Sequence, residues 1–488
     1  MFDASGKRVL ILGDIMLDVY SEGAVARVSP EAPVPVVLLR DEKFVPGGAA
    51  NVAANVAALG ANAELIGVIG QDAYGDRLLE TLSSSFDRID LAHLVRVDSR
   101  PTTTKTRVIG NRAQVARLDR EDASPLGREI EDRVIEAARL RLPFCDVVVV
   151  SDYSKGVCTD RVLRGVIKLA SSANKPLLVD PKRTDFSIYR GATIIKPNLK
   201  ELEAATCSSD GSDLSVEKAA ESLAVLTGAD LVVTRSEKGM SYISASCAPI
   251  HIPTAARNVF DVSGAGDTVM AALAVLLNFN NSSEGIAHAL SLANAAAGVV
   301  VGKQGTATVT PQEISKYINA ERIKKLTAEK IVTRSEAKSI SDSWRSQGLM
   351  VGFTNGCFDL LHPGHIQLLE KSAENCDRLI VALNSDLSVS RLKGPHRPVQ
   401  KQNARARVMA ALGMVDLVVI FEEETPAELI EELMPEILIK GSDYTLETVV
   451  GANVVTRAGG QVLLVDLIPD SSTTALIHKS SGGIKSLL

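Results

Sequence analysis

Short, nearly continuous apolar segments recur along this chain and alternate with Ala-rich stretches. In the first part of the sequence these segments are 8–14, 146–152, 176–182, 192–198 and 231–236. Each ends in a polar residue or Gly, a pattern typical of a parallel β-strand buried on both faces. The Ala-rich stretches 49–59 and 269–277 are predicted to be helices that cover such a sheet. The sequence therefore predicts an α/β fold, with ligand sites at the carboxyl ends of the strands.

A chain of 488 residues is longer than one hydrophobic core usually serves, so more than one domain is expected. The stretch 316–347 is rich in Lys, Glu, Ser and Arg. A second series of apolar segments follows it, namely 349–356, 379–386, 417–421, 437–443 and 462–466. We therefore expect two α/β domains, over residues 1–320 and 346–488, joined by a charged and partly helical connector over 321–345.

Composition and charge narrow the class of protein. Hydrophobic residues make up 45% of the chain and charged residues 23%, as in ordinary soluble proteins. No apolar segment approaches the roughly 20 residues that cross a bilayer, and the N-terminal stretch lacks a signal pattern. We therefore expect a cytoplasmic protein without a membrane partner. The six cysteines show no paired metal-ligand spacing, and the net charge of −6 argues against a nucleic-acid partner.

One region departs from the parallel-strand pattern. Residues 104–108 and 115–119 alternate with period two around a Gly-Asn-Arg turn, which predicts an antiparallel hairpin. Lys105 and Arg107 then lie on one face of it. Such a flap, outside the main sheet, is placed to cover a ligand.

The sharpest motif of the first half is the segment 261–267, Asp-Val-Ser-Gly-Ala-Gly-Asp, which precedes a long apolar helix. Small residues at Gly264, Ala265 and Gly266 allow backbone N–H groups to surround an anion at the helix N-terminus. Phosphoryl transfer needs such donors, together with a carboxylate that deprotonates the attacking hydroxyl. Asp267 is the candidate for that base. The alternative is a glycine-rich helix start capped by Asp.

A second glycine motif, Pro-Gly-Gly-Ala-Ala-Asn over 46–51, also lies where a loop becomes a helix. Gly47 and Gly48 admit a ligand close to the backbone, and Asn51 can bond sugar hydroxyls. Tight packing of the loop on the helix would explain the same glycines.

The second half contains the segment 355–365, Asn-Gly-Cys-Phe-Asp-Leu-Leu-His-Pro-Gly-His, between a strand and a helix. His362 and His365, three residues apart, share one helical face. At a helix N-terminus their imidazoles can donate hydrogen bonds to nucleotide phosphates during attack at the α-phosphate. A zinc pair is the alternative, although no third ligand appears at metal-site spacing.

With these motifs in order, the first 320 or so residues resemble the ribokinase-like sugar kinases. The resemblance implies a three-layer α/β domain with a small β-flap, the use of ATP and Mg²⁺, and a homodimer formed through the flap strands. Sugar contacts are implied for Asp14 and Asp18, which follow the first apolar segment. The residues placed at the ATP are Asn198, Glu201, Thr234, Ser236, Gly239 and Asn294.

Asn198 and Glu201 match the Asn-x-x-Glu element of that family, which implies that they help organise Mg²⁺ and phosphate. The same residue types commonly cap helices, so a purely structural role stays open.

The second half resembles the HxGH nucleotidyltransferases, of the cytidylyltransferase and pantetheine-phosphate adenylyltransferase type. This implies a Rossmann-like domain and direct in-line displacement of pyrophosphate by a sugar phosphate. The residues implied to bind the nucleotide are Phe358, Lys393, Arg397, Ser472 and Thr473. For the two hydroxyl residues, phosphate binding and helix capping stay equally open.

The order of the two halves, with the stretches 27–36, 151–156 and 295–303, resembles a family of bifunctional heptose 7-phosphate kinases and heptose 1-phosphate adenylyltransferases. The resemblance implies phosphorylation of D-glycero-β-D-manno-heptose 7-phosphate at O1. After a separate phosphatase step, adenylyl transfer to the 1-phosphate gives ADP-heptose for the lipopolysaccharide core. Lys105, Arg107 and Arg117 are candidates for binding the 7-phosphate, or are solvated flap charges. Another sugar phosphate, CTP in place of ATP, or one half as an inactive binding module are the remaining alternatives.

Two positions depart from the pattern of that family. Arg183 follows Asp-Pro-Lys where the family has Gly, and Asn403 stands where the family has Glu. The second departure puts the handling of ATP by the transferase half in doubt, although Arg405 keeps its position.

Overall fold

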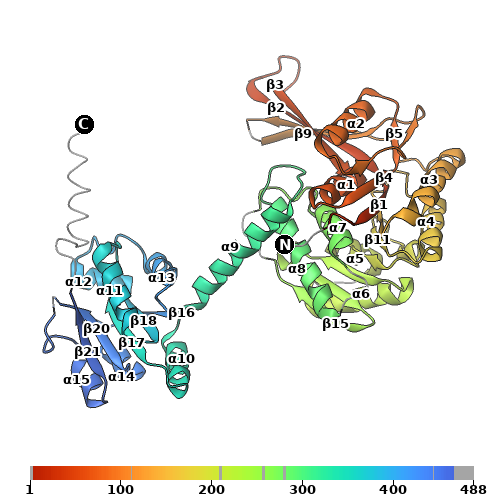
Figure 1. Ribbon diagram of the computed structural model, residues 1–488. Helices are drawn as coiled ribbons and strands as arrows, with labels where there is room; N and C mark the ends of the chain where they lie inside the picture. Colours follow the sequence, from red (N-terminus) through yellow and green to blue (C-terminus); the bar gives the residue numbers. More distant parts are fainter. Residues whose placement is uncertain are drawn as a thin grey trace. The chain divides into compact units, whose positions relative to one another are not determined.

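The computed structural model describes residues 4–111, 113–207, 211–254, 259–277, 282–442 and 444–466. The chain divides into two compact units, Met1–Asn319 and Ala320–Leu488 (Figure 1). Each unit is described by itself.

The first unit is built on a sheet of nine described strands in the order β15-β14-β13-β12-β11-β10-β1-β4-β6. The strands are β1 (Arg8–Gly13), β4 (Asn62–Ile66), β6 (Ile89–Asp90), β10 (Val147–Ser151), β11 (Leu177–Asp180), β12 (Ile194–Ile195), β13 (Asp230–Thr234), β14 (Met240–Ser244) and β15 (Cys247–Ile252). From β6 to β13 neighbouring strands pair in parallel, whereas β14 and β15 form an antiparallel hairpin at the edge. The predicted parallel strands are confirmed, and the edge hairpin was not expected.

Apolar side chains alternate between the two faces of this sheet. In β1, Val9 and Ile11 enter one hydrophobic core, and Leu10 and Leu12 enter another on the opposite face. The first core is covered by α1 (Ala49–Ala58), α2 (Ala73–Ser85), α7 (Ala265–Leu276) and α8 (Ser283–Val300). The second core is covered by α3 (Arg128–Arg141), α4 (Asp160–Ser172), α5 (Leu199–Thr206) and α6 (Asp213–Thr227). This is the predicted three-layer arrangement.

The flap is larger than the sequence predicted. The expected hairpin consists of β8 (Thr103–Gly110) and β9 (Ala113–Arg120), and it continues into β2 (Ile15–Val28) and β3 (Pro35–Gly48). The described order is β3-β2-β8-β9, and a separate pair joins β5 (Val68–Gly70) to β7 (Val95–Val97). Register shifts at Glu22/Gly23 and Val25/Arg27 interrupt the period-two alternation of β2. The sequence therefore lacked a regular strand signal there.

The second unit contains six described strands that pair in parallel in the order β16-β19-β18-β17-β20-β21. They are β16 (Ile331–Val332), β17 (Val351–Gly356), β18 (Arg378–Asn384), β19 (Leu417–Phe421), β20 (Ile437–Gly441) and β21 (Gln461–Val465). One face is covered by α10 (Arg334–Ser346), α14 (Ala427–Leu433) and α15 (Ala452–Arg457). The other is covered by α11 (Pro363–Glu374) and α13 (Gln402–Ala410), and α12 (Asp386–Lys393) follows β18. All five predicted strands are present.

The segment expected to be a connector differs from the prediction. A long helix, α9 (Pro311–Glu329), crosses the boundary between the units, but the residues after it belong to the second sheet. β16 pairs with β19, and Ala337, Ile340 and Trp344 of α10 face the hydrophobic core. The segment packs on the sheet because these three residues are spaced to lie on one face of a helix. The high proportion of charged residues around them obscured this spacing in the sequence.

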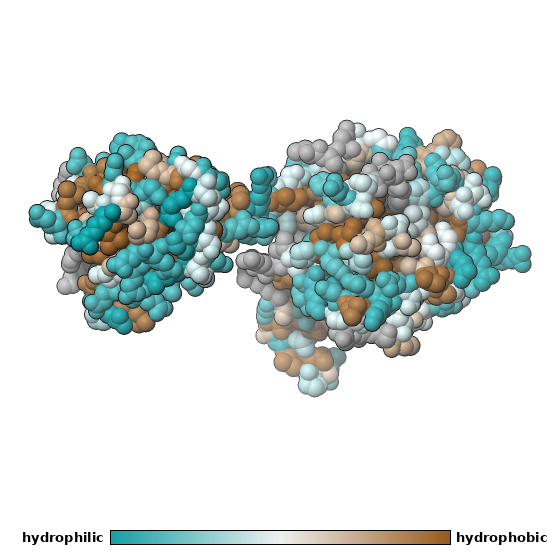
Figure 2. All heavy atoms as spheres, turned by 90° about the horizontal axis from the view of Figure 1, so that it is seen from below, coloured by the Kyte–Doolittle hydropathy of each residue, from teal (hydrophilic) through white to brown (hydrophobic). Residues whose placement is uncertain are grey.

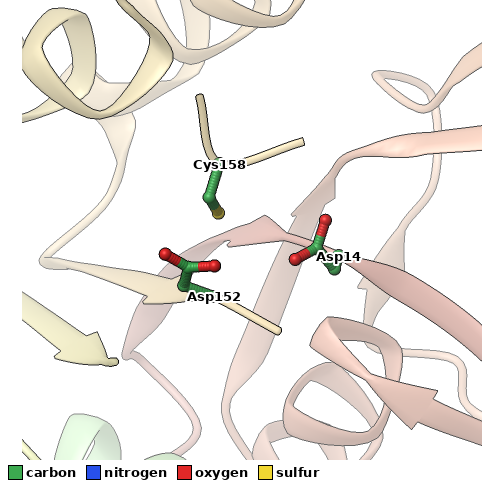
Figure 3. A group of neighbouring side chains, drawn as sticks. All are labelled: Asp14, Asp152 and Cys158. Carbon is green, nitrogen blue, oxygen red and sulfur yellow. The ribbon is translucent and has the colours of Figure 1, made fainter. Parts of the chain in front are cut away.

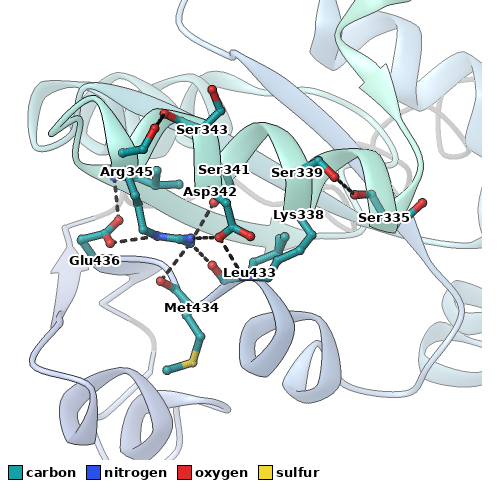
Figure 4. A network of polar contacts seen from close by, with 12 residues as sticks. Ser335, Lys338, Ser339, Ser341, Asp342, Ser343, Arg345, Leu433, Met434 and Glu436 are labelled. Carbon is teal, nitrogen blue, oxygen red and sulfur yellow. Dashed lines mark hydrogen bonds and ion pairs between the residues drawn. The ribbon is translucent and has the colours of Figure 1, made fainter.

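Arg345 fixes the end of α10 to the second unit (Figure 4). Its guanidinium donates to Glu436 Oε1 at 3.0 Å, to Ser341 Oγ at 2.8 Å and to the carbonyl oxygen of Leu433. Glu436 in turn accepts a hydrogen bond from the backbone N–H of Val351, at the start of β17. The helix is therefore part of the fold of this unit rather than a free linker.

Hydrophilic and hydrophobic surface alternate over both units in the space-filling view (Figure 2). Within the described ranges, none of the helices combines the length and the apolarity that crossing a membrane requires. Several large apolar side chains of the flap are exposed, namely Val28, Val34, Leu38, Leu39, Val115 and Leu118.

Candidate active sites

Asp267 lies in the first turn of α7, where the Ala-rich faces of α1 and α7 allow the two helices to pack closely. Its side chain is buried, and both carboxylate oxygens accept hydrogen bonds. Oδ2 accepts from Asn51 Nδ2 of α1 at 2.8 Å, and Oδ1 accepts from the hydroxyl of Tyr153 at 2.7 Å. The fold therefore brings the predicted base and the predicted sugar-binding Asn51 into contact.

Burial raises the pKa of Asp267 to about 7, and the nearby carboxyl of Asp180 adds to this rise. The hydrogen bonds from Asn51 and Tyr153 and the ammonium of Lys196 lower the pKa again, by a smaller amount. A carboxylate whose pKa lies near the working pH is well matched to proton abstraction. This is consistent with the role predicted for Asp267.

Gly264, the N-cap of α7, has a φ of +77°, and a Cβ on it would lie 2.7 Å from Asn51 Nδ2. Gly264→Ala is therefore expected to displace Asn51 and lower kinase kcat/KM by about 100-fold. The matched control is Gly228→Ala, since Gly228 has a φ of +74° with open space around it. Both variants carry the same backbone strain. If their thermal stabilities are similar, the difference between their kinase kcat/KM values therefore reports the contact with Asn51. Equal kinetic losses in the two variants would contradict the prediction.

A cavity of about 380 Å³ lies beside the N-terminus of α7. The predicted ATP residues that line it are Thr234, Ser236, Gly239 and Asn294. Ala265 and Gly266 of the predicted anion hole line it as well. Its apolar wall is formed by Val259, Val262, Val269 and Val301, which suits the flat face of a nucleotide base. No pattern in the sequence marks these valines as a group, because they come from separate loops and helices.

Asn198 and Glu201 do not line this cavity. They form a capping box at the start of α5, in which Asn198 Oδ1 accepts from the Glu201 N–H and Glu201 Oε2 accepts from the Asn198 N–H, each at 2.9 Å. The capping role that the sequence left open is thus present. Glu201 Oε1 also accepts from Lys182 Nζ at 3.1 Å, so one carboxylate oxygen already faces a cation.

The sugar-binding candidates meet where the flap joins the main sheet. Asp18 is buried, and its carboxylate accepts from Arg107 Nη1 at 2.5 Å and from Thr306 Oγ1 at 3.1 Å. A Cβ on Gly47 would lie 2.8 Å from Asp18 Oδ2, and Gly48 has a φ of +56°. These two glycines are therefore required for the close pairing of β2 with β3.

The cations of the flap differ in their surroundings. Lys105 is partly buried, which lowers the pKa of its ammonium despite the nearby Asp18. Arg117 is exposed and pairs with Asp119 on its own strand, with Nε to Oδ1 at 2.9 Å. The structure therefore places Lys105 and Arg107 near Asp18, whereas Arg117 forms an ion pair at the surface.

Asp14, Asp152 and Cys158 lie together beyond the ends of β1 and β10 (Figure 3), with a possible ligand atom of each within 4.8 Å of the others. Asp14 accepts from the backbone N–H groups of Tyr153, Lys155 and Val157 at 2.8–3.0 Å. The Asp152 carboxylate accepts from the Ser154 N–H and the Tyr189 hydroxyl. We interpret the group as a clamp for the loop after β10, because chain donors already engage both carboxylates.

In the second unit, a cavity of about 590 Å³ lies at the carboxyl ends of β17 and β20. The strand order reverses at this point, which is where open parallel sheets bind ligands. His362, His365, Phe358 and Lys393 line the cavity as predicted. It also contains Lys440, which the sequence did not single out and which lies at the end of β20.

The two imidazoles stack with their ring centroids 3.7 Å apart, and Phe358 lies against His365 at 5.0 Å. Burial, the neighbouring His362 and Lys393 lower the pKa of His365 to about 4, and burial also lowers the pKa of His362. Both rings are therefore neutral at physiological pH. Among the described residues, no third metal ligand joins them, so the zinc alternative gains no support.

Comparisons with known proteins identify the family. Residues 7–313 match the pfkB family carbohydrate kinases, and residues 353–473 match the cytidylyltransferase-like family. The bifunctional protein HldE of Azorhizobium caulinodans is 48% identical over 472 residues, 97% of this chain and 98% of that protein. The HldE protein of Caulobacter vibrioides is 50% identical over 477 residues, 97% of each chain. The chain belongs to the HldE family.

Solved structures show the fold of the first unit of this HldE-family chain. Arabidopsis thaliana ribokinase, complexed with ribose and ATP, aligns with a TM-score of 0.52 at 22% identity and covers 64% of this chain and 99% of its own. Phosphofructokinase-2 from Escherichia coli, in complex with potassium, aligns with a TM-score of 0.53 at 21% identity. The alignment covers 65% of this chain and 99% of the phosphofructokinase chain. The predicted ribokinase-like and nucleotidyltransferase folds are confirmed, and the chain is a carbohydrate kinase joined to a nucleotidyltransferase.

In this HldE-family structure Arg397 contacts the loop that precedes α13, and its predicted contact with the nucleotide stays a prediction. Arg397 does not line the transferase cavity, and its Nε donates to Asp359 Oδ2 at 2.6 Å. Asp359 also accepts from the backbone N–H groups of Val399 and Gln400, so the pair holds the loop before α13. A charged side chain next to a motif looks the same in sequence whether it binds a ligand or a loop. Ser472 and Thr473 lie outside the described residues.

The two departures from the family pattern have different structural settings. Arg183 pairs with Asp160 at 2.5 Å and with the buried Asp152 at 3.5 Å, so it compensates a carboxylate of the loop clamp. Asn403 is exposed at the start of α13. Arg405, two residues later, is buried and donates to the Cys357 carbonyl at 2.7 Å and to Asp386 at 2.9 Å. It therefore supports the loop that carries Phe358.

Proposed function

We propose that this chain performs two separate ATP-dependent steps of ADP-heptose biosynthesis. The first unit phosphorylates D-glycero-β-D-manno-heptose 7-phosphate at O1, and the second transfers an adenylyl group to D-glycero-β-D-manno-heptose 1-phosphate. The observation that carries the proposal is the similarity to HldE proteins over 97% of the chain, combined with a cavity in each unit that predicted site residues line. The sugar assignment depends on the first of these, because no small group of residues specifies seven carbons.

In the kinase step, Asp267 takes the proton of the O1 hydroxyl while this oxygen attacks the γ-phosphorus and ADP leaves. The backbone N–H groups around Gly264, Ala265 and Gly266 face the transferred phosphoryl group at the N-terminus of α7. The adenine occupies the valine-walled cavity, and Asp18 and Asn51 bind sugar hydroxyls. Lys105 and Arg107 are proposed to attract the 7-phosphate from the flap.

Mg²⁺ is proposed as the metal of this step, where it neutralises charge on the nucleotide phosphates. Glu201 is the candidate for holding it through Oε1, whose partner is the side chain of the half-exposed Lys182 at 3.1 Å; Mg²⁺ would replace this ammonium. Asn198 supports that carboxylate through the capping box.

In the transfer step, an oxygen of the sugar 1-phosphate attacks the α-phosphorus of ATP, and pyrophosphate leaves. Neutral His362 and His365 donate N–H hydrogen bonds as negative charge builds on the α-phosphate. Lys393 and Lys440, which line the same cavity, attract the phosphates of the two substrates. No covalent enzyme intermediate is needed.

The remaining proposals concern the assembly and the compartment. Exposed apolar side chains on the flap, such as Leu38 at 66% and Leu118 at 60%, support a homodimer through this sheet. The mass of the chain in solution tests it. Consumption of ATP in both steps and six free cysteines fit a cytoplasmic enzyme.

Turnover of the two heptose phosphates by the wild-type chain, followed by phosphorus NMR, tests the function. Heptose 7-phosphate with ATP and Mg²⁺ is expected to give the 1,7-bisphosphate, and heptose 1-phosphate is expected to give ADP-heptose and pyrophosphate. CTP in place of ATP is expected to give no product in the second reaction. Turnover in only one assay would indicate that the other unit is a binding module, and turnover in neither would overturn the sugar assignment.

A further inference from the structure

Tyr153 lies in the loop after β10, and its hydroxyl donates to Asp267 Oδ1 at 2.7 Å. The other oxygen of the carboxylate, Oδ2, accepts from Asn51 Nδ2 at 2.8 Å. A carboxylate with a single donor rotates broadly about its terminal torsion, whereas one donor on each oxygen fixes its plane. Tyr153 is therefore one of two side chains that set the direction in which Asp267 faces.

The other donor is itself fixed in orientation. Asn51 Oδ1 accepts from Asn55 Nδ2 at 3.0 Å, and Asn55 Oδ1 accepts from Thr268 Oγ1 at 3.2 Å. This chain of hydrogen bonds leaves the Asn51 amide nitrogen facing Asp267. It fixes Oδ2 only, so the orientation of the carboxylate plane depends on Tyr153.

The backbone of Tyr153 is held by the clamp described above. The buried Asp14 accepts from the Tyr153 N–H at 2.8 Å and from the Lys155 N–H at 3.0 Å. A loop residue that is fixed at both its backbone and its hydroxyl has little freedom. This is the arrangement that a precisely placed hydrogen bond requires.

Tyr153 also contacts the flap. Lys105 Nζ of β8 lies 5.7 Å from the centroid of the Tyr153 ring, within the range of a cation–π interaction. The same side chain therefore contacts both the predicted base and a predicted phosphate-binding cation.

We propose that Tyr153 is a positioning residue of the kinase, which orients the Asp267 carboxylate toward the sugar hydroxyl and connects it to the flap through Lys105. The inference rests on the proposed role of Asp267 as the base.

The charges around Asp267 determine the direction of the pH effect. Besides Tyr153, the ionisable groups that face it are Asp180, at the end of β11, and Lys196, after β12, whereas α1 contributes the neutral Asn51. Asp180 raises the pKa of Asp267, and the Tyr153 hydroxyl and Lys196 lower it. Removal of the hydroxyl therefore raises that pKa. Because the ionised carboxylate is the base, the acid limb of the kinase pH profile moves to higher pH.

The test is Tyr153→Phe in the full-length chain. Kinase kcat is expected to fall by about 10- to 100-fold, since a misdirected carboxylate loses the near-attack geometry. The KM for ATP is expected to stay unchanged, and the acid limb of kcat/KM is expected to shift to higher pH. Adenylyl transfer by the same preparation serves as an internal control for active protein.

The matched control is Tyr189→Phe, because the Tyr189 hydroxyl donates to the carboxylate of Asp152 at 2.8 Å. Tyr189→Phe also removes a tyrosine hydroxyl, but that hydroxyl contacts Asp152 of the loop clamp and not Asp267. The position of the acid limb does not depend on the fraction of folded enzyme, so partial unfolding leaves the test decisive. An unshifted limb in Tyr153→Phe, or an equal shift in Tyr189→Phe, would overturn the positioning role. Full kinase activity in Asp267→Asn would instead overturn the assignment of the base.

Discussion

Asp267→Asn is expected to lower kinase kcat by about 100- to 10,000-fold, the range that a general base contributes. The amide keeps the size of the side chain but cannot take the proton from the sugar hydroxyl. Adenylyl transfer is expected to continue at the wild-type rate, because no residue of α7 belongs to the second unit. Phosphorus NMR with heptose 7-phosphate, and separately with heptose 1-phosphate, measures both reactions on one preparation.

The same role of Asp267 predicts the direction in which the activity of the wild-type kinase changes with pH. Burial raises the pKa of Asp267 to about 7, so the ionised and active form is lost as pH falls through that value. Kinase kcat/KM is therefore expected to decline below about pH 7, whereas adenylyl transfer is not expected to decline there. Asp267→Asn is expected to lose this limb along with the rate.

Asp230→Asn is the matched control for this substitution. Asp230 also accepts a hydrogen bond from a tyrosine hydroxyl, that of Tyr242 at 2.7 Å, but it lies at the start of β13. The predicted base Asp267 instead contacts Tyr153, which follows the opposite, carboxyl end of β10. If Asp230→Asn reduced kcat as much as Asp267→Asn, the loss would reflect packing of the sheet, and the base would have to be sought elsewhere.

Features that depend on local periodicity or on short motifs could be predicted from the sequence. The parallel strands follow from continuous apolar segments, and Asp267, His362 and His365 follow from motifs at strand-to-helix turns. The structure places Asp267 beside one cavity and both histidines in the lining of another. Local pattern suffices here because the backbone geometry of these motifs is set by neighbouring residues.

Features that depend on contacts between distant segments could not be predicted. Tyr153 reaches Asp267 across 114 positions of the chain, and although the stretch 151–156 carries the family resemblance, nothing in it indicates this contact. For Arg397 the residue type was informative but the partner was not, and for Glu201 the sequence left helix capping and phosphate chemistry both open. A charge that binds a loop or caps a helix has the same sequence signature as one that binds phosphate. In α10 the apolar face consists of only three residues, and the many Ser, Lys and Arg residues around them obscured it in the sequence.

Replacing both histidines of the second unit, as His362→Ala/His365→Ala, is expected to lower the kcat of adenylyl transfer by about 100- to 1,000-fold or more. Each imidazole N–H is a donor aimed at the phosphate that gains charge during attack, and donors of this kind typically contribute such a factor. Because the rings stack at 3.7 Å, each single variant also disturbs its neighbour, so the two losses should not add. The kinase reaction is expected to be unaffected.

His396→Ala is the control, since His396 is exposed in the same unit and does not line the cavity. The pH dependence of adenylyl transfer shows whether the histidines donate as neutral imidazoles or as imidazolium ions. With the pKa of His365 lowered to about 4, kcat/KM for the free enzyme should show no limb from His365 between roughly pH 5.5 and 8. Burial also lowers the pKa of His362, so any limb from His362 should lie below the ordinary histidine pKa of 6.5. A fall in kcat/KM as pH rises through about 6.5 would mean that imidazolium is the active form, and the buried, stacked pair would then have to be opened by the nucleotide before the reaction.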